Sequence, residues 1–144
     1  MAAGVPDPDE PTAGLDAISK RQLFAQLLSA VQDEDRAVLI SSPAITDLER
    51  FADHVGLIKN GRMIVEGATD EVVERYRLVD IASDQAAGVE REPGVLVQHR
   101  DSHRWRVLLD QQLTPIEQLS AGGRSLLADS SLSLEELVVA LGRN

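Results

Sequence analysis

The sequence predicts an α/β fold over residues 1–76 and a small α+β extension over residues 77–144. Three patterns support this prediction. A helical apolar repeat over residues 16–32 is followed by an apolar strand at 37–41, which together form half of a βαβ unit. An Asn-Gly pair lies between two apolar runs, and a capped helical pattern stands near the end. The 144 residues, 43% of them hydrophobic, suffice for one domain with a small addition.

The composition excludes several classes of partner. A net charge of −10 argues against nucleic acid and anionic lipid surfaces as main partners, because both require a basic face. The absence of cysteine excludes disulfides and thiolate chemistry and fits a reducing compartment. No stretch approaches the roughly 20 apolar residues of a membrane-spanning helix. We therefore expect a cytoplasmic chain that inserts into no membrane and contacts one only through a partner.

Candidate chemistry lies in the octapeptide from Asp9 to Asp16, which has the sequence Asp-Glu-Pro-Thr-Ala-Gly-Leu-Asp. Asp9 and Glu10 supply acceptor-only oxygens that suit a hard cation and a proton. On an extended backbone the two carboxylates point to opposite sides. The alternative for this pair is two exposed acids near a frayed end. Asp16 is placed to cap the helix that follows.

The first elements follow directly from residue patterns. Residues 16–32 are expected to form a helix, since apolar side chains recur at helical spacing. Its apolar face comprises Leu15, Leu23, Phe24, Leu27, Leu28 and Val31. Residues 37–41, Ala-Val-Leu-Ile-Ser, are expected to form a buried strand. Pro43 suits the first turn of a second helix, where its missing N–H costs nothing.

A hairpin is predicted over residues 55–67. Its turn residues Asn60 and Gly61 both tolerate positive φ, and apolar runs flank them. A short helix is expected from Thr69 to Tyr76, with Thr69 as its N-cap.

The second half is expected to alternate short strands and helices. Strands are predicted at 77–82, 95–99 and 105–109, with a loop between the first two. A helix is expected from Pro115 to Leu119 with Thr114 as its cap. The final helix, from Ser133 to Gly142, has a capping box formed by Ser133 and Glu136.

The octapeptide resembles the Walker B and D-loop segment of ABC transporter ATP-binding subunits. The Ser-Ser strand end at 41–42 and the Asn-Gly hairpin follow in the family's order, so the resemblance covers Asp9 to about Tyr76. It implies ATP and Mg²⁺ as cofactors. It further implies that Asp9 lies near Mg²⁺ and that Glu10 acts on the attacking water. Asp16 would serve the nucleotide site across a dimer interface, a role compatible with capping.

Three features depart from the family. Pro43 stands where the family has a histidine that contacts the γ-phosphate. The phosphate-binding loop Gly-x-x-x-x-Gly-Lys-Ser/Thr is absent, since neither of the two lysines, Lys20 and Lys59, follows a glycine. Pro6 and Pro8 stand where a buried strand should precede Asp9. We therefore expect a fragment truncated before Walker B, without Walker A and the signature loop, although a replaced start at residues 1–8 stays open.

Two functional hypotheses follow, and ATP hydrolysis by this chain alone is not expected under either. In the first, the chain belongs to an ATP-binding subunit and works only with a complementing half. In the second, it is a regulatory module that docks on an intact ATP-binding subunit or on the transporter's membrane subunit. A decayed fragment is the third possibility. The first two place it in the cytoplasm, peripheral to the inner face of the membrane.

Other candidate residues lie at the turn between the strands predicted at 95–99 and 105–109, or in the strand ends beside it. His99 and His103 flank a turn without a third metal ligand, so solvated histidines are expected. Arg100, Arg104 and Arg106 suit a phosphate, although such residues more often line a solvated strand face.

Overall fold

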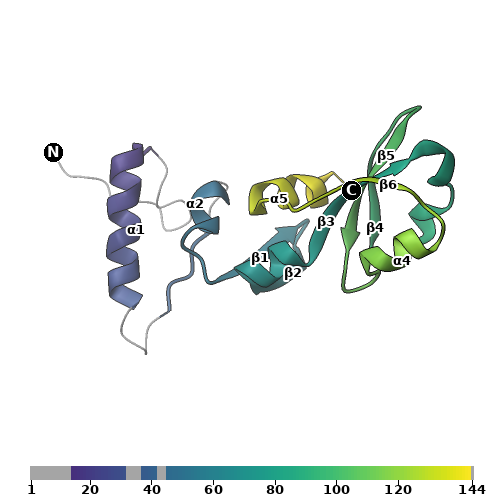
Figure 1. Cartoon of the computed structure of the whole chain (residues 1–144). Helices are drawn as coiled ribbons and strands as arrows, with labels where there is room; N and C mark the ends of the chain where they lie inside the picture. Colours follow the sequence, from purple (N-terminus) through teal and green to yellow (C-terminus); the bar gives the residue numbers. More distant parts are fainter. Residues whose placement is uncertain (1–13, 32–36, 42–44, 144) are drawn as a thin grey trace. The chain divides into compact units, whose positions relative to one another are not determined.

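The computed structural model describes residues 14–31, 37–41 and 45–143 (Figure 1). The chain divides into two compact units, residues 1–51 and residues 52–144. The boundary predicted after residue 76 follows the family resemblance rather than packing, and it stays a prediction. Helices and antiparallel sheets are both present, which is compatible with an α/β protein.

The first unit contains two helices, α1 (Ala17–Val31) and α2 (Ile45–Glu49). The helix predicted over 16–32 is therefore confirmed. Its apolar face is only partly used, because Phe24 is buried whereas Leu15 and Leu28 remain exposed. Phe24 stacks on Phe51 with ring centroids 4.5 Å apart. This aromatic pair joins α1 to the segment that follows α2.

The buried strand predicted at residues 37–41 is wrong. These residues have no regular secondary structure, and Leu39 is 99% exposed. A strand needs a neighbour that accepts and donates its backbone hydrogen bonds, and no described strand pairs with this segment. Pro43, predicted to start the next helix, lies outside the described residues.

The second unit begins with the predicted hairpin, formed by β1 (His54–Lys59) and β2 (Arg62–Ala68). Asn60 and Gly61 have φ of 51° and 73°, as this turn requires. Helix α3 (Thr69–Glu74) follows, but Thr69 is not its N-cap. Ala68 occupies that position, and the Thr69 hydroxyl instead donates to the carbonyl of Ala52. The hydroxyl thus joins the start of α3 to the segment before β1.

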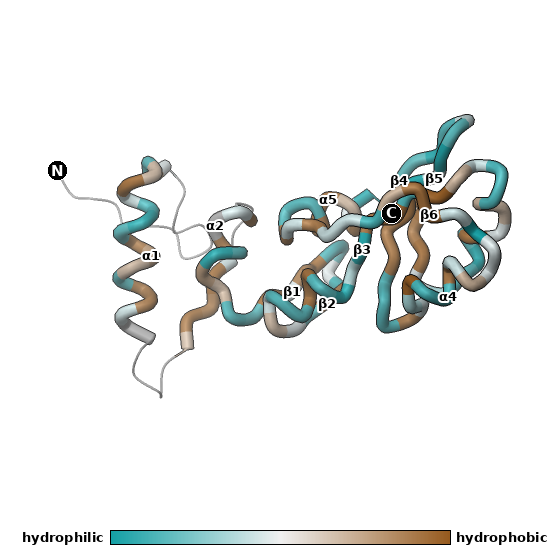
Figure 2. Tube along the Cα trace, viewed as in Figure 1, coloured by the Kyte–Doolittle hydropathy of each residue, from teal (hydrophilic) through white to brown (hydrophobic). Residues whose placement is uncertain are grey.

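A four-stranded antiparallel sheet forms the rest of this unit, in the order β4-β5-β3-β6. Its strands are β3 (Tyr76–Ala82), β4 (Val95–Arg100), β5 (Arg104–Asp110) and β6 (Leu126–Ser130). The first three were predicted. β6 was not, because most of its side chains are exposed and no alternating apolar pattern marks it. Figure 2 shows apolar colouring along these strands and a hydrophilic connection between β4 and β5.

Each face of the sheet packs into its own apolar cluster. The first cluster contains Leu108 of β5 and Leu137 and Leu141 of α5 (Leu134–Gly142), together with residues of α3 and the hairpin. The second contains Val79 of β3 and Leu119 of α4 (Ile116–Ala121), with residues of two short 3₁₀ turns, Ser83–Gln85 and Val89–Arg91. The sheet therefore has a helix on each side.

Local hydrogen bonds fix the two later helices. The predicted capping box of α5 is present, since Ser133 and Glu136 bond to each other's backbone N–H. The Lys59 Nζ donates to the carbonyl of Gly142 at 3.0 Å, which joins the hairpin to the end of α5. Thr114 does not cap α4: Pro115 is its N-cap residue, and the Thr114 hydroxyl donates to the Pro93 carbonyl. Among the described residues, no helix is long and apolar enough to span a membrane.

Candidate functional site

The predicted carboxylates are described only in part. Asp9 and Glu10, the predicted Mg²⁺ and catalytic residues, lie outside the described residues. Asp16 lies within them and directly precedes α1. Within the described part of the chain, no group of three or more histidine, aspartate or glutamate residues is arranged to hold a metal ion.

Asp16 caps α1, as its sequence position predicted. Gly14 has a φ of 76°, which only glycine adopts without strain, and it turns the chain into the helix. The Ser19 N–H donates to Asp16 Oδ1 at 2.7 Å, and the Lys20 N–H donates to the Asp16 carbonyl at 2.9 Å. The Ser19 N–H lowers the pKa of the exposed Asp16 carboxyl. Asp16 is therefore an anion at neutral pH, and the helix N-terminus stabilises that charge.

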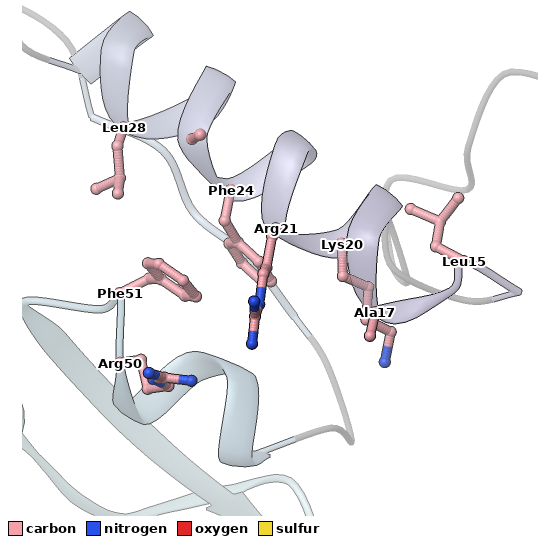
Figure 3. A pocket seen from close by; sticks show the side chains of 9 residues that line it. Leu15, Ala17, Lys20, Arg21, Phe24, Leu28, Arg50 and Phe51 are labelled. Carbon is pink, nitrogen blue, oxygen red and sulfur yellow. The ribbon is translucent and has the colours of Figure 1, made fainter.

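A pocket of about 660 Å³ lies beside this cap. Its floor contains the stacked rings of Phe24 and Phe51, which face each other from α1 and from the segment after α2 (Figure 3). Three cationic residues, Lys20, Arg21 and Arg50, also line it. The remaining lining residues are Leu15, Ala17, Ala25 and Leu28. Apolar and cationic side chains therefore line the same open hollow.

The second unit contains a charged cluster that was not predicted from the sequence. Asp80 of β3 is buried, with 4% of its side chain exposed, and it binds two arginines of β5. Arg106 donates to its two carboxylate oxygens at 2.7 and 2.8 Å, and Arg104 donates at 2.9 Å. Arg106 in particular lowers the pKa of the Asp80 carboxyl. The pattern that could have revealed this cluster is an aspartate within the apolar run Leu-Val-Asp-Ile, together with two arginines at alternate positions of a neighbouring strand.

Among the described residues, the histidines at this end of the sheet belong to no group that could hold a metal ion. His99 Nε2 lies 3.6 Å from an oxygen of Asp101, and both side chains are exposed. Asp101 accepts the backbone N–H groups of His103 and Arg104, which fixes the turn between β4 and β5.

Comparison with known proteins gives three informative relatives. The chain is 30% identical over 118 residues to the bacitracin transport ATP-binding protein BcrA of Bacillus licheniformis, covering 81% of this chain and 37% of that protein. It is 36% identical over 103 residues to the daunorubicin/doxorubicin resistance ATP-binding protein DrrA of Streptomyces peucetius, with coverages of 65% and 31%. Its curated homologues are ABC transporter ATP-binding subunits.

A third relative is the energy-coupling factor transporter ATP-binding protein EcfA2 of Staphylococcus aureus. It is 37% identical over 73 residues, which cover 50% of this chain and 26% of that protein. The matched region thus spans only about a quarter to a little over a third of these relatives. No family model matches the chain. The likeness to ATP-binding subunits that the octapeptide predicted is confirmed, whereas the roles of Asp9, Glu10 and Asp16 remain predictions.

Proposed function

We propose that this chain is part of the ATP-binding subunit of an ABC transporter. The similarity to BcrA, DrrA and EcfA2 carries this proposal, and the octapeptide from Asp9 to Asp16 supports it independently. ATP and Mg²⁺ are the ligands that the relatives imply. In this proposal Asp9 holds Mg²⁺ and Glu10 acts on the attacking water. Asp16 joins the nucleotide site across a dimer interface while it caps α1.

A complete nucleotide site needs residues beyond this sequence. Phosphoryl transfer depends almost wholly on positioning the phosphates and stabilising their charge. The 144 residues contain no phosphate-binding loop, and Pro43 stands where the related subunits are expected to have a histidine. The missing loop therefore comes from another segment or a second chain, and coupling of ATP hydrolysis to transport requires that complement. We place the assembly in the cytoplasm, at the inner face of the membrane, through contact with a membrane subunit.

Nucleotide binding tests the proposal. A fluorescent ATP analogue with Mg²⁺ is titrated into the chain alone, and into the chain mixed with an intact ATP-binding subunit of the BcrA or DrrA kind. We expect no saturable binding by the chain alone and tighter binding in the mixture than by the intact subunit. The proposal is contradicted if the chain alone binds no nucleotide and the mixture binds it no more tightly than the intact subunit does. Micromolar binding by the chain alone contradicts the need for a complement.

Matched variants assign the effect to the predicted carboxylates. In the mixture, Asp9→Asn is expected to remove the Mg²⁺-dependent part of the increase in nucleotide affinity, because Mg²⁺ prefers carboxylate oxygens. Asp7→Asn removes the same charge two residues earlier, outside the octapeptide, and is expected to leave the increase in nucleotide affinity unchanged. Equal losses in both variants indicate general charge effects rather than a metal ligand.

A regulatory module is the second candidate function. The observation that favours it is the second unit, which has two apolar clusters and a capped terminal helix of its own. Such a unit can fold and dock on an intact ATP-binding subunit or on a membrane subunit without supplying catalytic groups. The substitution Glu10→Gln separates the two functions. It abolishes a catalytic contribution to ATP hydrolysis in the mixture, whereas it leaves a docking effect on the partner unchanged.

A further inference from the structure

One face of the four-stranded sheet carries a row of charged and small residues across its strands. Asp80 of β3 lies directly opposite Arg106 of β5 and Ala128 of β6, and Ala82 lies opposite Arg104. Directly opposed residues of an antiparallel pair share a face. Leu78 and Leu108, an opposed pair further along the same face, pack in the cluster with α5. The α5 helix therefore covers one end of this face, and the arginines occupy the other.

The two arginines stay accessible although they bind Asp80. Their side chains are 45% and 39% exposed, while the carboxylate between them is almost fully buried. Each guanidinium has five N–H donors, and the bonds to Asp80 use one donor of Arg104 and two of Arg106. Both guanidinium groups share the one buried carboxylate of Asp80. The buried carboxylate holds both guanidinium groups in place.

Neighbouring groups complete this environment. His99 of β4 lies opposite Arg106, and the exposed Asp101 carboxylate lies 4.0 Å from Arg104 Nε. A bulge at Gln98 interrupts the pairing next to His99. The Gln98 Nε2 is buried without a hydrogen-bond partner, the only such side-chain atom among the described residues. A buried amide donor without an acceptor is unfavourable, so the bulge carries a local energetic cost.

We propose that this surface, which comprises Ala82, His99, Arg104, Arg106 and Ala128 and which we call the arginine face, binds a phosphate group. A phosphate presents several acceptor oxygens and matches the forked donors of guanidinium groups. The ligand is free phosphate or a phosphate ester, including a phospholipid headgroup. This site goes beyond the proposed ATPase role, since it uses none of the octapeptide carboxylates.

A titration with inorganic phosphate tests the site. Amide spectra of the ¹⁵N-labelled full chain are recorded against phosphate, with chloride adjusted to constant ionic strength because surface charges are screened by salt. We expect saturable shifts at residues of β3 and β5 with a Kd on the order of 1 mM. Shifts that do not saturate, or that spread over the whole chain, overturn the assignment.

Two arginine variants make the test specific. Arg104→Gln removes a guanidinium while Asp80 keeps both bonds from Arg106, so the sheet is expected to fold, which the Trp105 emission spectrum verifies. Phosphate binding is expected to weaken about tenfold, because a charged hydrogen bond is lost. Arg77→Gln removes an arginine that binds Asp129 on the opposite face, and it is expected to leave the Kd unchanged. Equal Kd values in wild type and Arg104→Gln, or equal weakening in both variants, overturn the proposal.

Vesicles distinguish the two sources of phosphate. The chain is sedimented with phosphatidylcholine vesicles that contain or lack phosphatidic acid. Binding that needs phosphatidic acid and disappears in Arg104→Gln assigns the site to a lipid headgroup. Amide shifts on addition of phosphate, without vesicle binding, assign the site to a soluble phosphate. Vesicle binding that persists in Arg104→Gln counts against the arginine face.

Discussion

Replacing Asp80 by asparagine is the most direct test of how the second unit is held together. Asp80 is the buried acceptor of three hydrogen bonds from Arg104 and Arg106. Asparagine keeps the shape but loses the charge and one acceptor oxygen. Its amide N–H₂ then faces guanidinium donors, which leaves donors opposed to donors. The substitution therefore disrupts the cluster without creating a cavity.

The expected loss of stability follows from burial. Removing one partner of a fully buried ion pair costs about 3–5 kcal/mol. Both arginines are partly exposed and regain water on the substitution, so we reduce the expected cost to about 2 kcal/mol. For a domain of this size, that corresponds to a fall in Tm of about 10 °C.

Urea unfolding followed by Trp105 fluorescence measures this loss. Trp105 is the only tryptophan and lies in β5 between the two arginines, so its signal reports the second unit. Asp129→Asn is the matched control, because Asp129 binds Arg77 in a surface pair with 37% and 30% of the side chains exposed. That variant is expected to lose less than about 1 kcal/mol. An Asp80→Asn loss equal to that of Asp129→Asn would refute the reasoning.

The pH dependence of stability provides a second readout of Asp80. Its pKa is lowered in the folded state, chiefly by Arg106, so the folded chain binds the proton less readily than the unfolded chain. The stabilisation is therefore complete above the ordinary aspartate pKa and is lost as the pH falls toward the lowered value. Wild type should lose stability more steeply than Asp80→Asn on acidification below about pH 4. Parallel pH profiles of the two proteins contradict this assignment.

Three further predictions concern turns and caps. Gly94→Ala should lower the free energy of unfolding, measured by thermal unfolding, by about 2–4 kcal/mol. Its φ is +73°, and the new Cβ would meet side-chain carbons at 2.8 and 2.9 Å. Gly88→Ala is the control, with φ of +82° and open space around the new Cβ, and it should lower the free energy of unfolding by about 1 kcal/mol. Ser133→Ala should lose about 1 kcal/mol in urea unfolding because α5 loses its cap, and Ser131→Ala, outside the box, should be neutral. Asp16→Ala should speed amide hydrogen exchange in the first turn of α1, and unchanged exchange would show that the cap contributes nothing.

Short-range patterns predicted most elements of the second unit. Asn60-Gly61 identified the hairpin because both residues accept positive φ, and Ser133 with Glu136 identified the start of α5 because a capping box is local. The assignments of Thr69 and Thr114 as caps were wrong. Each hydroxyl donates instead to a carbonyl distant in sequence, and no local pattern indicates that choice.

The sequence by itself determined the turns, the capped final helix and the octapeptide that relates this chain to ATP-binding subunits, because these depend on neighbouring residues. Tertiary structure decided the rest. Residues 37–41 have strand propensity but no described partner strand, so their pattern alone could not place them in a sheet. Asp80 meets Arg104 and Arg106 only because β3 and β5 pair in one register, and a shift of one residue would move these side chains to the other face.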